Sequence, residues 1–130
     1  MAVRNYRTGF AVTDTPGDGV CLQASASASN YQTLLQHGSN YQVPAGKTLY
    51  ITRVHFNVSV AGAAFNIGDA TAAVTNSASS PANNIQTTGS ITGTTTEMII
   101  DCFIPVAQNL FPFLKAGSGS TNITCYGVVI

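Results

Sequence analysis

The chain has very few charged residues. Asp, Glu, Lys and Arg together make up 8% of its 130 residues, whereas an average soluble domain has about a quarter. Five positive and five negative side chains cancel, so the formal net charge is zero. Nucleic-acid binding needs a clustered basic surface, and we therefore expect no nucleic-acid partner. Neutral proteins tend to associate, which favours a component of an assembly.

Long apolar runs are also missing. No run approaches the ~20 residues that a membrane-spanning helix needs, so we expect no membrane partner. The first ten residues include Arg4 and Arg7, but the apolar segment of a secretory signal does not follow them. We therefore expect a protein that stays in the cytoplasm until it is assembled.

Cysteine is scarce, and the three that occur lack the short spacing of a metal site. Cys21, Cys102 and Cys125 each lie among apolar or alternating neighbours. Free cysteine is among the most buried residue types, so we predict buried, reduced thiols. A Cys102–Cys125 disulfide is the alternative, which a cytoplasmic origin disfavours.

Residues that could carry chemistry are few. The chain has two histidines, and one of them, His55, falls on the polar side of a predicted strand, where we expect it to be solvated. No serine lies in a nucleophile-elbow pattern, so we expect no enzyme and no cofactor. Asp14, Asp18 and Asp69 could offer oxygen ligands, but calcium sites gather more carboxylates than any loop here supplies. We therefore expect no metal site.

The residues that are present favour an all-β protein. Val, Ile, Thr, Tyr and Phe dominate the regular segments, and Gly, Asn, Ser and Pro separate them. The strongest predicted strands are residues 48–60, 97–104 (ended by Pro105) and 122–130, and weaker ones are 6–12, 20–28, 64–68, 85–91 and 110–114. Only residues 31–37 favour a short helical turn. This spacing predicts a single antiparallel β-sandwich, jelly-roll-like, over residues 13–130, with an extended N-terminal arm or first strand over residues 1–12.

Alternation along two strands predicts the core. Apolar residues recur at every second position, which places them on one face of a strand. The predicted core residues are Val54, Phe56, Val58, Met98, Ile100, Cys102 and Ile104. Leu49 and Ile51 have the opposite phase, which predicts a bulge or bend near Thr52.

Both ends of the chain suggest contacts with other proteins. Arginine and tyrosine are favoured interface residues, and they cluster with a phenylalanine near the start. The candidate partner-interface residues are Arg4, Tyr6, Arg7 and Phe10, with a solvated tail as the alternative. The chain ends in apolar residues 128–130, which a lone domain has little reason to expose. We therefore expect a homo-oligomer, with a trimer as the favoured form.

Four short stretches carry a resemblance to a known group of proteins. They are VPAGKTLYI at 43–51, IPV at 104–106, LFPF at 110–113 and KAG at 115–117, in a frame rich in Ala, Thr, Ser and Asn. In texture and turn placement the chain resembles the small β-sandwich virion proteins of tailed bacteriophages, especially capsid decoration (cement) proteins. The resemblance implies a virion protein, assembled in the host cytoplasm, that sits over seams between major capsid subunits without catalysis. A receptor-binding, lectin-like module of a phage tail or fibre tip is the alternative.

Overall fold

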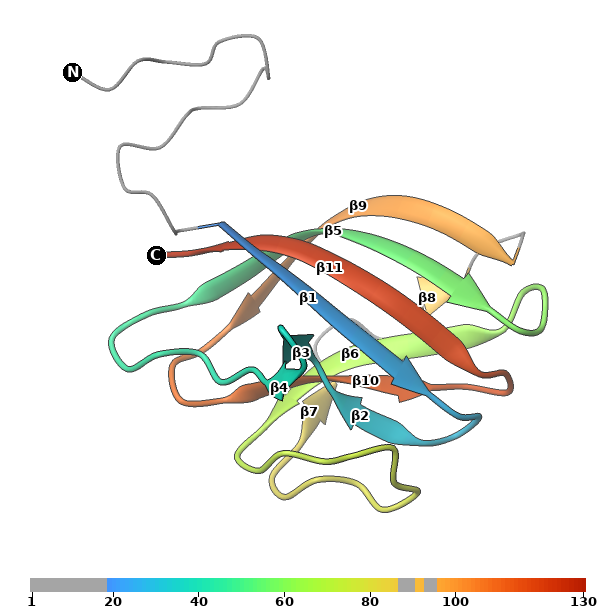
Figure 1. Ribbon diagram of the computed structural model, residues 1–130, viewed down its shortest axis with the longest axis horizontal. Coiled ribbons are helices and arrows are strands. Elements are labelled where there is room, and N and C mark those ends of the chain that lie inside the picture. The colour runs from blue at the N-terminus through green and yellow to red at the C-terminus, as the bar shows by residue number, and fades with distance from the viewer. Residues whose placement is uncertain (1–18, 87–90, 93–95) are drawn as a thin grey trace, which may run out of the picture.

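The computed structural model describes residues 19–86, 91–92 and 96–130, and within them the chain is all β (Figure 1). No helix occurs in these residues, and so none that is long and apolar enough to cross a membrane. The strands are β1 (Gly19–Ala26), β2 (Tyr31–Thr33), β3 (Leu35–Gln36), β4 (Ser39–Asn40), β5 (Leu49–Val58), β6 (Ala64–Ala70), β7 (Ile85–Gln86), β8 (Ile91–Thr92), β9 (Glu97–Val106), β10 (Phe111–Ala116) and β11 (Thr121–Val129).

The strands form two antiparallel sheets that pack face to face, which confirms the predicted β-sandwich. One sheet has six strands in the order β4-β3-β1-β11-β5-β9, and the other has the order β2-β10-β6-β7, with β8 also paired to β6. The chain passes repeatedly from one sheet to the other, so strands that follow each other in sequence often lie in opposite layers (Figure 1). The jelly-roll form stays a prediction. The predicted arm at residues 1–12, with its strand at 6–12, lies outside the described residues.

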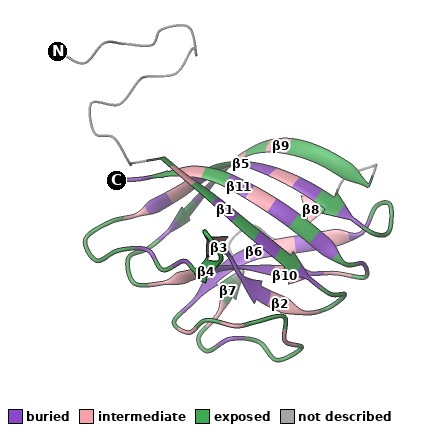
Figure 2. Ribbon diagram, viewed as in Figure 1, coloured by how far each residue is buried: buried purple, intermediate pink, exposed green. Residues whose placement is uncertain are grey.

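The core lies between the sheets and includes the predicted face of β5. Val54, Phe56 and Val58 are buried, and buried and exposed residues alternate along β5 and its neighbour β11 (Figure 2). Phe56 meets Phe65 of β6 edge to face, with 4.9 Å between the ring centroids. These contacts join the two sheets at the centre of the sandwich.

The predicted bulge near Thr52 is confirmed. The register between β5 and β9 shifts between Ile51 and Arg53, so Ile51 and Val54 both face the core although three positions separate them. The Thr52 hydroxyl donates a hydrogen bond to the Tyr126 carbonyl at 3.2 Å. The register of β5 with β11 shifts at the same place, between Tyr126 and Gly127.

The predicted core face of β9 is only partly right. Ile104 is buried, Ile100 and Cys102 are half-buried against the core, and Met98 is 39% exposed. The prediction for Met98 is wrong because β9 is an edge strand, and β7 and β8, at the corresponding edge of the other sheet, have two residues each. β9 also continues past Pro105, since an edge strand tolerates a proline.

Two other predictions need correction. Residues 31–37 form no helical turn: they divide into β2 and β3, which belong to opposite sheets. Their apolar pair, Leu34 and Leu35, lies where the chain crosses between the sheets and so does not mark a helix face. The predicted strand at 85–91 appears as the separate strands β7 and β8, with residues 87–90 outside the described part.

All three cysteines are free thiols. Cys125 is buried and Cys102 half-buried, but Cys21 is exposed, which contradicts its predicted burial. Cys21 lies opposite Tyr126 in the register of β1 with β11, on the outward side of the sheet. Alternation along β1 therefore places it in solvent, while Leu22 is buried.

The connection from β6 to β7 lies on the side of the five-stranded sheet that faces away from the core (Figure 1). Thr33 donates its amide hydrogen to the Val74 carbonyl, and Tyr31 donates to that of Ser77, at 2.9 and 2.8 Å. Because β10 lies between β6 and β2, the connection crosses over β10 to reach that edge. Phe113 of β10, outside the main core cluster, is fully buried and meets Tyr31 of β2 edge to face, with 5.6 Å between the ring centroids.

Candidate partner interface

The predicted interface residues Arg4, Tyr6, Arg7 and Phe10 lie outside the described residues. The described chain begins at Gly19, which lies opposite Val128 in the register of β1 with β11. Gly19 therefore lies at the end of the six-stranded sheet where the C-terminus also lies (Figure 1). The outward surface of this sheet, called the outer face below, holds most of the large exposed apolar side chains of the described residues.

An apolar patch occupies this end of the outer face. It consists of Tyr50, Phe103, Val128 and Ile130, which with Thr52 line a shallow depression of about 340 Å³. Phe103 and Ile130 are each 69% exposed. The rings of Tyr50 and Phe103 stack with 5.1 Å between centroids. Large apolar side chains in this position mark a surface that is suited to protein contact.

An ion pair and an imidazole–carboxylate hydrogen bond lie beside the patch and join β5 to β9. Arg53 Nε lies 2.9 Å from Asp101 Oδ1, and His55 Nε2 lies 2.7 Å from Glu97 Oε2. His55 is thus on the outward side of β5, as predicted, and contacts a carboxylate. Exposed pairs of this kind contribute at most about 1 kcal/mol to stability, so they add little to the fold but set the charge pattern of the face.

A wide groove connects the apolar and charged parts of the outer face. Its volume is about 1020 Å³, and it runs from Cys21 of β1 past Tyr126 to Ile99 and Asp101 of β9. Ile99 is 60% exposed. The sequence carried a signal for this surface, because β9 has large apolar residues at both odd and even positions. A strand that is apolar on both sides needs a second contact besides the core.

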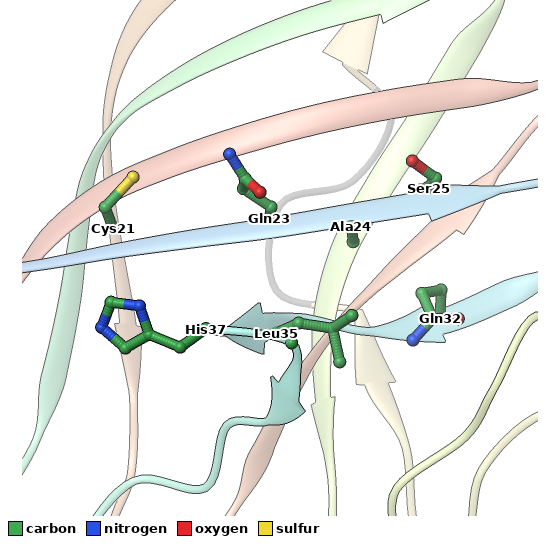
Figure 3. A pocket seen from close by; sticks show the side chains of 8 residues that line it. Cys21, Gln23, Ala24, Ser25, Gln32, Leu35 and His37 are labelled. Carbon is green, nitrogen blue, oxygen red and sulfur yellow. The ribbon is translucent and has the colours of Figure 1, made fainter.

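A smaller, more polar pocket lies at the β1–β3 edge of the same sheet. Its volume is about 400 Å³, and Figure 3 shows Gln23 and Ser25 on β1 above Leu35 and His37. Gln32 also lines it, but its side-chain amide is already bonded to the Thr33 carbonyl and the Asn76 amide, both at 2.9 Å. The pocket offers hydroxyl, amide and imidazole groups next to one apolar side chain.

No cluster of three or more His, Cys, Asp or Glu side chains that could hold a metal occurs in the described part of the chain. Asp69 is buried, and its Oδ1 has no hydrogen-bond partner among the described residues. Burial raises the pKa of this carboxyl above its ordinary value. Its register neighbours, Ile85 and Pro112, supply no further carboxylate, while Asp14 and Asp18 lie outside the described residues.

Comparison with known proteins finds no matching family, no similar curated sequence and no similar solved structure.

Proposed function

We propose that the protein is a structural component of a virion, a capsid decoration or cement protein that bridges major capsid subunits as a homo-oligomer. The observation that carries the proposal is the apolar outer face on an otherwise neutral sandwich. A free protein would keep such a surface small. The passage of successive strands between the two sheets supports the jelly-roll form of the sandwich.

A cement protein needs many modest contacts rather than an active site. Contacts repeated by symmetry turn weak single affinities into strong attachment, because each further contact is intramolecular. The low charge of the chain suits this role, since contacts made by apolar packing and neutral hydrogen bonds depend little on salt. In this proposal Arg4, Tyr6, Arg7 and Phe10 anchor the protein on the major capsid protein.

The test compares virus particles with and without the protein. Particles that lack it should break at lower temperature or milder osmotic stress, and adding the purified protein should restore them. Deletion of residues 2–8 should reduce occupancy on the particles, while circular dichroism shows that the sandwich still folds. Unchanged particle stability would contradict the proposal.

The polar pocket favours one alternative, a receptor-binding module that takes a glycan. Hydroxyl and amide groups beside an apolar side chain are what a neutral sugar requires, and Gln23, Ser25 and Leu35 provide them. In that case Gln23→Ala should reduce adsorption of the virus to host cells and leave particle stability unchanged. Full adsorption together with fragile particles lacking the protein would favour the cement function.

A further inference from the structure

We propose that the outer face of the six-stranded sheet packs against the same face of a second copy, across a two-fold axis that runs along the strands between β5 and β9. This contact is independent of the capsid role and would form in the free protein. Its two components are the exposed apolar side chains and the charge pattern beside them.

The apolar component comes from residues that the fold leaves uncovered. Phe103, Ile99 and Tyr126 are 69%, 60% and 43% exposed. On the other sheet the outward Phe113 is fully buried, and its neighbour Tyr31 bonds the connection from β6 to β7. The large outward aromatic side chain of one sheet is thus covered within the chain, whereas the described residues provide no such cover for Phe103 on the other.

The charge pattern shows what kind of partner fits. Arg53 and Asp101 are direct neighbours in the register of β5 with β9, on strands about 4.8 Å apart, and Arg53 Nε lies 2.9 Å from Asp101 Oδ1. A partner with charge of one sign would be attracted by one of these residues and repelled by the other. A partner with the reverse order of charge, negative opposite Arg53 and positive opposite Asp101, is attracted by both residues.

A second copy supplies that order by symmetry. When two such faces meet across a two-fold axis along the strands, β5 of each copy lies over β9 of the other. Arg53 of each copy then faces Asp101 of the other, and the four charges alternate in sign. Tyr50 of each copy, on β5, then lies over Phe103 of the other, on β9. Aligned sheet packing accommodates the twist of both sheets.

A two-fold contact of this kind closes at two copies. The inference therefore favours a dimer over the trimer that the sequence alone suggests, because the low charge and apolar C-terminus behind the trimer predict association but not its symmetry. It also assigns the outer face to self-association.

The test uses charge reversal and sedimentation equilibrium. The wild-type protein should sediment at twice 13.5 kDa at micromolar concentrations. Arg53→Asp makes this part of the face wholly negative and Asp101→Arg makes it wholly positive. Each variant alone should therefore be monomeric, with its dissociation constant raised about tenfold or more. An equal mixture of the two should form a heterodimer, because each then meets its opposite.

The mixture separates contacts between copies from the ion pair within one copy, since neither variant can rebuild that pair alone. Heterodimer formation also shows that both variants are folded. Ser80→Asp, which adds a charge in the exposed connection between β6 and β7, should remain dimeric.

A wild-type monomer or trimer, dimeric single variants, or a mixture that stays monomeric would each overturn the proposal. A dimer that is lost only on deletion of residues 1–18 would do so too, because the occupant of the face would then be that segment. None of these results decides whether the protein decorates a capsid, which the particle-stability experiment tests separately.

Discussion

Phe56 joins the two sheets through its contact with Phe65 and is 1% exposed. Phe56→Ala removes the ring and leaves a cavity that neighbouring side chains fill only in part. We expect a loss of about 3–5 kcal/mol in the free energy of unfolding, measured by urea denaturation. Ile85→Ala is the control, because Ile85 is 60% exposed; a Phe56→Ala variant as stable as wild type would show that this residue is not core.

The buried carboxyl of Asp69 makes stability depend on pH. Burial raises its pKa in the folded protein above the ordinary 3.8, so the folded state holds the proton more tightly than the unfolded state. Below pH 3.8 the carboxyl is protonated in both states and the free energy of unfolding is not reduced by its burial. As pH rises through the folded pKa, the buried carboxyl must ionise and stability is lost. Asp69→Asn removes the charge and should stabilise the protein by about 1 kcal/mol at neutral pH.

The same substitution should have little effect in acid, where the carboxyl is already neutral. Urea unfolding of both proteins at neutral pH and below pH 3.8 measures the difference. If Asp69→Asn raises the free energy of unfolding equally at both pH values, this explanation is wrong.

At the scale of elements, Asn76 fixes the connection between β6 and β7. Its Oδ1 accepts a hydrogen bond from the Ser27 amide at 2.9 Å, its carbonyl accepts one from the Asn30 side chain at 3.0 Å, and its amide donates to Gln32 Oε1 at 2.9 Å. Asn76→Ala removes the three hydrogen bonds of the side chain, which join it to Ser27 and Asn30, and should weaken this attachment by about 1–2 kcal/mol. Faster hydrogen exchange at the Tyr31 and Thr33 amides should report it.

Asn76→Gly is the matched control, because Asn76 has a φ of +39°, which glycine adopts more readily than alanine. The Tyr31 and Thr33 amides of Asn76→Gly should also exchange faster than in wild type. The increase should be smaller than in Asn76→Ala, because glycine does not add the cost of a positive φ. Wild-type exchange in both variants would show that the side chain does not hold the segment.

Strands could be predicted from the sequence wherever the pattern is local. The phase change between Ile51 and Val54 was enough to predict the bulge, and alternation was enough to place Phe56 in the core. The exposure of Met98 depends on β9 lying at a sheet edge, which is a property of strand order and not of the strand itself. The apparent helical turn at 31–37 is likewise a crossing between sheets, visible only once the partners of β2 and β3 are known.

The candidate site was harder to predict from the sequence than the fold. The predicted residues near the start, such as Arg4 and Tyr6, lie outside the described part and stay predictions. The outer face combines side chains from β1, β5, β9 and β11, which are distant in sequence, so only the double-sided apolar pattern of β9 hinted at it. That Phe113 is buried and Phe103 exposed depends on what packs against each sheet and not on the local sequence of the two strands.

At the scale of the whole molecule, the central claim is that a neutral sandwich uses its outer face for assembly. Ile99 and Ile85 provide a matched pair, since each is 60% exposed but they lie on opposite sheets. Sedimentation velocity of Ile99→Ser and Ile85→Ser at equal concentrations tests the claim most directly. We predict that Ile99→Ser shifts the protein towards the monomer while Ile85→Ser behaves as wild type; equal behaviour of the two variants would contradict it.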